Sequence, residues 1–390
     1  MTPPIYLDYH ATTPTDPRVA ARVLDAMTAG FGNASSVDHA IGDRAATAIQ
    51  TARRQIAALL HCRPRDLLFT AGATESLNLA IQGRVNYLAS QGKTARVACT
   101  AVEHEAVLAT CRALAHQGRI QLQEIPVNRQ AQVDLKAVET LCAAGLDLLC
   151  VMAANNEVGT LYPVRELAAI ANRYGTAYLC DAAQALGKIP LDFQGWGIAL
   201  LAGSAHKLYG PQGIGLLAVR SDQGLQPLCY GGGQQQGLRP GTLNLPGIVG
   251  FGEACRWRLA EMAQDEAEIA RQRDRLQALL QARIPGLQVN GDRDNRLAGN
   301  LHIAIPGIPN SAITARLHPQ LAIATGSACS SGVEQPSHVL RAMQLPEATL
   351  EGALRLGLGK FTTPADIDRA AELLVATVDQ IRQLLEPARP

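Results

Sequence analysis

The sequence predicts an α/β protein with a large domain, built on a mostly parallel sheet of the seven-stranded type flanked by helices, and a smaller α+β domain. The first observation is that short apolar runs alternate with amphipathic stretches from residue 16 to residue 219. The second is that these runs lack strict apolar and polar alternation, which is typical of parallel strands buried on both faces. The third is a change of pattern after residue 254, where one long amphipathic stretch begins.

The apolar runs predict the strands of the large domain, and the amphipathic stretches predict its crossover helices. Ligands of open α/β sheets bind at the carboxyl ends of the strands, so we expect the functional side chains just after the apolar runs. The expected strands cover residues 66–72, 95–102, 146–154, 177–183, 198–203 and 213–219, and the expected helices cover residues 17–27, 76–89, 104–117 and 164–175.

Residues 254–284 predict a long connecting helix, because they are rich in charge and contain neither Gly nor Pro. We expect a large cofactor-binding domain over residues 15–257 and a small domain made of residues 1–14 and 258–390. In the small domain the expected strands cover residues 287–291, 300–305, 321–326 and 353–359, and the expected helices cover residues 311–318 and 367–385.

Composition excludes several classes of protein. The chain has 390 residues and a formal charge of +1, and 4% of its residues are aromatic, so it offers neither the basic field nor the stacking side chains of a dedicated nucleic-acid binder. No apolar run reaches the ~18 residues of a membrane span, and the N-terminal residues lack the order of a secretory signal. We therefore expect a cytoplasmic protein with no membrane association and no direct nucleic-acid binding.

The nine cysteines do not form a recognisable framework. They are scattered without CxxC pairs or histidines at metal-ligand spacing, so the sequence predicts neither disulfides nor a metal site. Most lie in apolar runs, where cysteine behaves as a small buried hydrophobe. Cys329 differs, because its neighbours in ATGSACSSG are small and polar, as in an exposed loop.

The most informative residues are a lysine and an aspartate that follow two successive apolar runs. Lys207 lies in SAHKLYGPQGIG, where it could form a Schiff base, although a single lysine is more often only solvated. Asp181 in LCDAAQALGK closes the preceding run, and a buried carboxylate there could keep a pyridine nitrogen protonated, or could cap a helix. The pair points to pyridoxal phosphate chemistry.

Three further sites admit two readings each. Gly72, Ala73 and Thr74 precede a helix, whose first N–H groups could hold a phosphate or could simply be capped. Asn155 in AANNEVGT could reach a ligand or form a turn. His104 in AVEHEAV lies at a strand-to-helix junction, where a histidine is often structural.

Taken together, the motifs resemble the cysteine desulfurases of the class V aminotransferase family, over essentially the whole chain. The motifs that carry this resemblance, in chain order, are YLDYHATTP, FGNASS, TAGATESLNLA, VEHEAV, NNEVG, DAAQALGK, GSAHKLYGPQGIG, RPGTLN, TGSACSSG and LRLGLGKFTT. Ten motifs in the same order make chance agreement implausible.

The resemblance implies a role for each matching residue. Lys207 would bind pyridoxal 5'-phosphate covalently, Asp181 would pair with its ring nitrogen, and Gln184 would contact its phenolic oxygen. His104 would stack on the ring as a catalytic residue, and Asn155 and Arg355 would hold the substrate carboxylate. The phosphate would be held by Ala73, Thr74, Ser204 and His206, joined by Thr242 from the other subunit of a homodimer.

Cys329 matches the persulfide-forming cysteine of the family. The implied reaction removes sulfur from L-cysteine, gives L-alanine and leaves a persulfide on Cys329, which passes to a sulfur-acceptor protein for iron–sulfur cluster assembly or thiolation. The thiolate is the attacking form, so the loop must be accessible. The resemblance places this loop in the small domain.

Some positions depart from the family pattern: His10, Ala34 and Leu77 stand where other residue types are common. The chain also stops at LLEPARP, where relatives that dock an iron–sulfur scaffold often extend further, so we expect weaker scaffold binding. Two alternatives stay open. A selenocysteine lyase would remain active on selenocysteine without Cys329, and a non-enzymatic binding protein would lack the visible cofactor band.

Overall fold

The computed structural model describes residues 3–325 and 337–385, and its centre is a seven-stranded sheet in the order β2-β8-β7-β6-β5-β3-β4. All neighbouring strands pair in parallel except β8, which is antiparallel to both β7 and β2. The strands are β2 (Leu67–Thr70), β3 (Ala95–Thr100), β4 (Ile120–Ile125), β5 (Leu148–Cys150), β6 (Ala177–Asp181), β7 (Leu200–Ser204) and β8 (Gly215–Val219).

The predicted α/β class is confirmed, with two differences in detail. The run at residues 213–219 forms an antiparallel strand, because a short loop that contains Lys207 joins β7 directly to β8 without a crossover helix. The sequence reading also missed β4, whose residues alternate between buried and exposed at the edge of the sheet and so do not form an apolar run.

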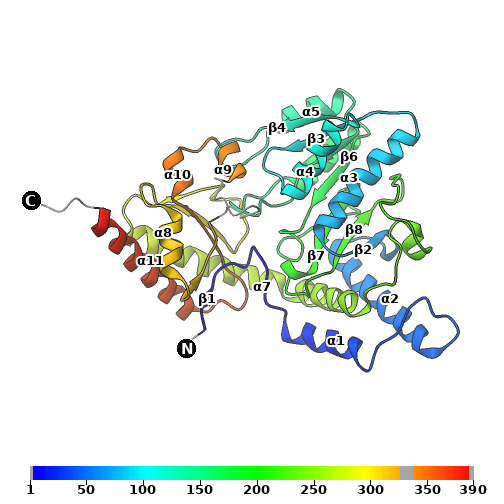
Figure 1. Ribbon diagram of the computed structural model, residues 1–390, viewed down its shortest axis with the longest axis horizontal. Helices are drawn as coiled ribbons and strands as arrows, with labels where there is room; N and C mark the ends of the chain where they lie inside the picture. The colour runs from blue at the N-terminus through cyan, green and yellow to red at the C-terminus, as the bar shows by residue number, and fades with distance from the viewer. Residues whose placement is uncertain (1–2, 326–336, 386–390) are drawn as a thin grey trace, which may run out of the picture.

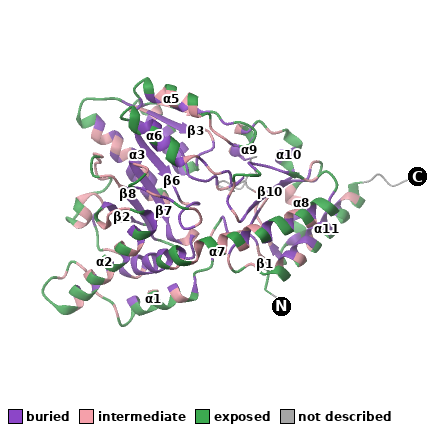
Figure 2. Ribbon diagram, turned by 180° about the vertical axis from the view of Figure 1, so that it is seen from behind, coloured by how far each residue is buried: buried purple, intermediate pink, exposed green. Residues whose placement is uncertain are grey.

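Helices cover both faces of this sheet (Figure 1). One face packs on α3 (Ala73–Ser90) and α4 (Glu105–His116), and the other packs on α2, α5, α6 and the first half of α7. The strands between these layers are buried (Figure 2). The remaining helices of this part are α1 (Pro17–Met27), α2 (Ala40–Leu60), α5 (Leu135–Ala143) and α6 (Val164–Arg173), of which α2 and α5 were not predicted.

The long helix α7 (Leu245–Arg283) links the large sheet to a second, smaller one (Figure 1). It begins earlier than predicted, because Pro246 occupies its first turn and its glycines fit against other helices. A methyl group on Gly252 would lie 2.6 Å from the Cα of Ala52 in α2. Glycine at this position therefore allows α2 and α7 to pack closely.

The smaller sheet is antiparallel, in the order β12-β10-β9, and it packs on α8, α11 and the second half of α7. The pair β1 and β11 lies beside it. The elements are β1 (Ile5–Tyr6), β9 (Gln288–Val289), β10 (Asn300–Ala304), β11 (Leu321–Ala322), β12 (Ala353–Gly357), α8 (Asn310–Leu317), α9 (His338–Ala342), α10 (Glu347–Glu351) and α11 (Pro364–Leu385).

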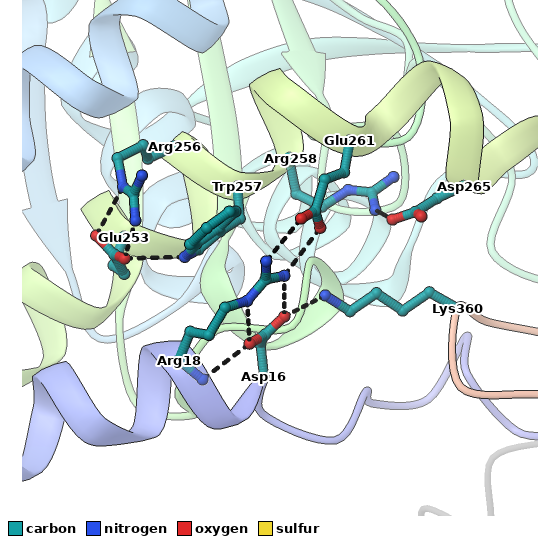
Figure 3. Close-up of polar contacts among 9 residues, drawn as sticks. All are labelled: Asp16, Arg18, Glu253, Arg256, Trp257, Arg258, Glu261, Asp265 and Lys360. Carbon is teal, nitrogen blue, oxygen red and sulfur yellow. Dashed lines mark hydrogen bonds and ion pairs between the residues drawn. The ribbon is translucent and has the colours of Figure 1, made fainter.

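A cluster of charged residues joins α1, α7 and the loop after β12 (Figure 3). Arg18 pairs with Asp16 at 2.8 Å and with Glu261 at 2.6 Å, and Lys360 pairs with the same Asp16 carboxylate. The Arg18 guanidinium also lies 3.5 Å from the centre of the Trp257 ring. Because Asp16 and Lys360 are both largely buried, this contact fixes the N-terminal part of the chain against the C-terminal part.

Every helix in the described part of the chain is too short or too polar to span a bilayer.

The division into a large domain over residues 15–257 and a small domain stays a prediction. Residues of α9, α10 and β12, which belong to the predicted small domain, contribute to the same apolar cluster as α2 and α6.

We expect Gly252→Ala to lower the free energy of unfolding by about 1–3 kcal/mol, because the added methyl group overpacks the contact with Ala52. Alanine has a higher helix propensity than glycine, so a change in the opposite direction would contradict this packing argument. Chemical denaturation measures the effect. The control is Ala260→Val on the exposed side of the same helix, which we expect to change stability by less than about 0.5 kcal/mol.

Candidate active site

A cavity of about 810 Å³ lies at the carboxyl ends of the parallel strands, bounded by the N-terminal segment and by β12. The structure brings most of the predicted site residues together there, from five separate segments of the chain. Those that line the cavity are Ala73, Thr74, His104, Asp181, Gln184, Ser204, His206, Lys207 and Arg355.

Two of the predicted residues that the structure describes do not line this cavity. Asn155 is fully buried beside it, and Thr242 is exposed on the loop before α7. Cys329 lies outside the described residues, so its predicted role stays a prediction.

Lys207 lies in the loop between β7 and β8, and its side chain is held by the N-terminal segment. The ammonium group donates to the carbonyl oxygen of His10 and, at 2.9 Å, to that of Ala11. Burial, followed by the positive charge of Lys188, lowers the pKa of Lys207 to about 7. A substantial share of the amine is therefore unprotonated near neutral pH, as a nucleophile or a base requires.

Asp181 is the last residue of β6, and its carboxylate is buried at the cavity wall. Among the described residues, its only hydrogen bond comes from the backbone N–H of Ala183 at 2.9 Å. Burial raises the pKa of this carboxyl group, because a lone charge is poorly solvated there. A cationic N–H group in the cavity would satisfy it.

The first turn of α3 forms another wall of the cavity. Gly72 precedes the helix in an extended conformation, and no side chain caps the helix within the described part of the chain. A methyl group on Gly215 of β8 would lie 2.6 Å from the Cα of Gly72, so glycine at position 215 permits this close approach. The uncapped N–H groups at Ala73 and Thr74 are therefore available to an anion, and the negative charge of the neighbouring Glu75 is paired with Arg239 at 2.8 Å.

The two predicted histidines have defined hydrogen bonds. The Nδ1 atom of His104 accepts from the backbone N–H of Ala106 at 3.1 Å, so this residue caps α4 while its ring faces the cavity. The Nδ1 atom of His206 lies 3.0 Å from the hydroxyl of Thr12. Burial, followed by the charge of Lys207, lowers the pKa of His206 to about 4, so its ring is neutral.

Arg355 of β12 is held in place by two acceptors. It donates to Asp8 at 2.8 Å and to the carbonyl oxygen of Asn156 at 3.0 Å. Its Nε atom is buried and has no partner among the described residues. The guanidinium is therefore oriented before any ligand arrives, which suits recognition of a carboxylate.

Asn155 has a structural role in this conformation, and the neighbouring Asn156 lines the cavity instead. The Asn155 side chain accepts from the backbone N–H groups of Glu157 at 2.9 Å and Val158 at 3.0 Å, and it donates to the carbonyl oxygen of Val102 at 3.2 Å. Its predicted contact with the substrate stays a prediction.

The sequence reading missed Asp8 as a site residue and treated His10 only as a departure from the pattern. In the structure both reach the site, Asp8 through Arg355 and His10 through Lys207 and Gln184. They lie two residues apart in a turn, in which the N–H of Ala11 donates to the carbonyl oxygen of Asp8 at 2.9 Å. The sequence YLDYHATTP therefore held no periodic signal for their contacts.

The cavity fits pyridoxal phosphate. It combines a lysine of lowered pKa, a buried carboxylate that lacks a cationic partner, and an uncapped helix N-terminus, which match the aldehyde, the ring nitrogen and the phosphate of that cofactor. Within the described residues, no group of His, Cys, Asp and Glu could hold a metal ion.

Comparison with known proteins identifies the class. The family model "Aminotransferase class-V" matches residues 5–370, and the chain belongs to this family, whose members depend on pyridoxal phosphate. The predicted resemblance to cysteine desulfurases is confirmed. "Cysteine desulfurase, mitochondrial" of Arabidopsis thaliana is 39% identical over 387 residues, which are 98% of this chain and 84% of the relative. "Cysteine desulfurase IscS" of Anaeromyxobacter dehalogenans is 38% identical over 98% of this chain and 94% of its own length.

Solved structures agree with the sequence relatives. A structure titled "NIFS-LIKE PROTEIN" superposes with a TM-score of 0.89 at 30% identity and covers 96% of this chain and 99% of its own. The predicted fold and the predicted pyridoxal-phosphate-dependent enzyme class are therefore confirmed.

We expect cofactor-free protein to react with added pyridoxal phosphate at a rate that rises with pH around a midpoint near 7. The unprotonated amine is the nucleophile, and a lowered pKa makes it available at lower pH than for an ordinary lysine. Stopped-flow absorbance in the visible band measures the rate, and Lys207→Ala serves as the blank. A midpoint near 10 would contradict the assigned environment of Lys207.

We expect Asn155→Ala and Asn156→Ala to differ in kind. Asn155→Ala removes several buried hydrogen bonds and should lower the free energy of unfolding by about 1–3 kcal/mol. Asn156→Ala should leave stability within about 0.5 kcal/mol and act on KM. Denaturation and steady-state kinetics on both variants test this, and a stable Asn155→Ala protein with a raised KM would restore the predicted contact of Asn155 with the substrate.

Proposed function

We propose that this protein removes sulfur from L-cysteine, with the cavity residues in the roles that the motifs predict. The observation that carries the proposal is the convergence of Lys207, Asp181 and Arg355 on one cavity from three separate segments of the chain. Lys207 binds the cofactor, Asp181 pairs with its ring nitrogen, and Arg355 orients the substrate through its carboxylate.

Bound pyridoxal phosphate supplies an electron sink for negative charge at the substrate Cα. The chain's own residues transfer the proton at that atom. The amine of Lys207 is the group that takes and returns the Cα proton, since burial keeps part of it unprotonated near pH 7. Gln184 and His104 line the same cavity, where they would contact the cofactor.

Cys329 receives the sulfur. The overall change is balanced, because L-cysteine and the Cys329 thiol give L-alanine and a Cys329 persulfide, with no external oxidant or reductant. A sulfur-acceptor protein then takes the outer sulfur atom, for iron–sulfur cluster assembly or thiolation. The described cysteines support this choice by contrast: most are buried, and burial raises the pKa of Cys180 and Cys255 far from the range of a reactive thiolate.

The proposed assembly is a homodimer in which Thr242 of a second copy completes the phosphate site. Thr242 is exposed in this chain, and the same loop exposes Tyr230 at 88% and Leu228 at 37%. Thr242 is therefore accessible to a second copy of the chain. The expected cytoplasmic location stays a prediction.

We expect Cys329→Ser to abolish release of sulfide from L-cysteine, while the visible cofactor band and its response to L-cysteine remain. Serine keeps the shape of the side chain but does not accept sulfur. The assay quantifies alanine and sulfide with a reductant present, and the matched control is Cys229→Ser, at a cysteine that is exposed in the described part of the chain. Equal alanine and sulfide from wild type and from Cys229→Ser support the proposal. Formation of pyruvate and ammonia, unaffected by Cys329→Ser, would contradict it and indicate a lyase.

A further inference from the structure

A second lysine lies next to the cofactor cavity, and none of the functions described above uses it. Lys188 follows Gln184 by four residues in the turn after β6, and its ammonium donates to the Oε1 atom of Gln184 at 3.3 Å. Burial lowers the pKa of Lys188, against the opposing charge of Glu266 in α7. Removing a lysine and an acidic neighbour from water costs free energy of folding, so a function for Lys188 would explain why the chain places a lysine here.

The chain holds Lys188 in this place through α7. The fully buried Arg258 donates to the carbonyl oxygen of Gly187 at 2.7 Å, directly before Lys188, and to Glu266 at 2.8 Å. It also pairs with Asp265 (Figure 3). The backbone at Lys188 and its counter-charge are therefore fixed by the same arginine.

The hydrogen bonds around Gln184 have one consistent direction. An ammonium group can only donate, so the amide oxygen of Gln184 must face Lys188, and the amide NH₂ must then face the carbonyl oxygen of His10, 2.8 Å away. The Nδ1 atom of His10 lies 3.2 Å from the same amide oxygen, so it must carry a proton and donate. The carbonyl oxygen of His10 and the ammonium of Lys188 thus require the same orientation of the amide, so Lys188 reinforces this orientation, and the tautomer of His10 follows from it.

This orientation has a consequence at the cavity. Gln184 presents N–H donors toward the region that it shares with Lys207, whose ammonium binds the same carbonyl oxygen of His10. Donors suit a cofactor oxygen that carries negative charge. With the amide reversed, an oxygen would face that oxygen, and the two would repel.

We propose that Lys188 is a positioning residue for the reaction: it holds Gln184 as a hydrogen-bond donor to the cofactor and adds positive charge beside Lys207. After burial, Lys188 is the largest influence that lowers the pKa of Lys207. The inference rests on the proposed roles of Lys207 and Gln184. The other charged or titratable groups that act on Lys207 or Lys188 are Asp8, His10, Asp181, His206, Arg258, Glu266 and Arg355.

The test is a pH titration of the visible cofactor band in the holoenzyme. Removing a nearby positive charge favours the protonated form, so Lys188→Met should raise the midpoint by on the order of 1 pH unit. It should also weaken cofactor affinity by about 3- to 10-fold, because Gln184 loses the hydrogen bond from Lys188 that supports the donating orientation of its amide. Lys188→Arg should restore the wild-type midpoint, and Lys136→Met, at an exposed lysine, is the control for loss of a charge.

A second variant reduces the same charge without removing the lysine. Glu266→Gln removes the negative charge that favours the protonated form of Lys188, so Lys188 carries less positive charge near neutral pH and the midpoint should rise, as in Lys188→Met. This variant tests the effect of the Lys188 charge on the midpoint even if Lys188→Met does not fold or does not retain cofactor.

An unchanged midpoint in Lys188→Met, or a Glu266→Gln midpoint that stays or falls, would overturn the role of Lys188 while the site assignment stands. A wild-type band that persists in Lys207→Ala would overturn both the site assignment and this inference.

Discussion

The site depends on the N-terminal segment, residues 7–16, which is hydrogen-bonded to both sheets at once. On one side, the backbone of Tyr9 donates to Gly357 of β12, and Gly357 donates back to Leu7. On the other, Thr13 donates to His206 and Asp16 donates to Tyr209, on either side of Lys207. Without this segment, the carbonyl oxygens that hold Lys207 and the carboxylate that holds Arg355 would both be lost.

The same arrangement concentrates positive charge. Lys207 and Arg355 line the cavity and Lys188 lies beside it, so their positive charges act on one another, and Asp8 and Asp181 oppose them only in part. Burial makes each lysine ammonium less stable than in water. An anion bound in the cavity would therefore stabilise the charged form of these groups. A phosphate at α3 and a substrate carboxylate at Arg355 are such anions, which explains why the polypeptide tolerates two lysines so close together.

Sequence reasoning predicted those features that local patterns determine. Apolar runs marked the central strands, and residues directly after them marked the cavity, because parallel strands bring their carboxyl ends to one edge. The edge strand β4 was missed because its exposed side chains break the apolar run. The helix α7 was predicted to begin too late, because Gly250 and Gly252 resemble helix breakers until the packing against other helices is known.

Supporting residues were harder to predict than reacting ones, for a physical reason. A reacting group must be of one chemical type, so Lys207 and Asp181 stand out from the sequence alone. A supporting group needs only to supply a donor, an acceptor or a charge, and its partner lies far away in sequence: 174 residues separate His10 from Gln184, and 347 separate Asp8 from Arg355.

His10 illustrates this difference. Its backbone carbonyl oxygen, which any residue could supply, holds Lys207 and Gln184, whereas its side chain supplies one N–H to the Gln184 amide oxygen that Lys188 already occupies. A departure from the family pattern at this position therefore leaves the reacting groups unchanged and affects only how strongly the Gln184 amide is held.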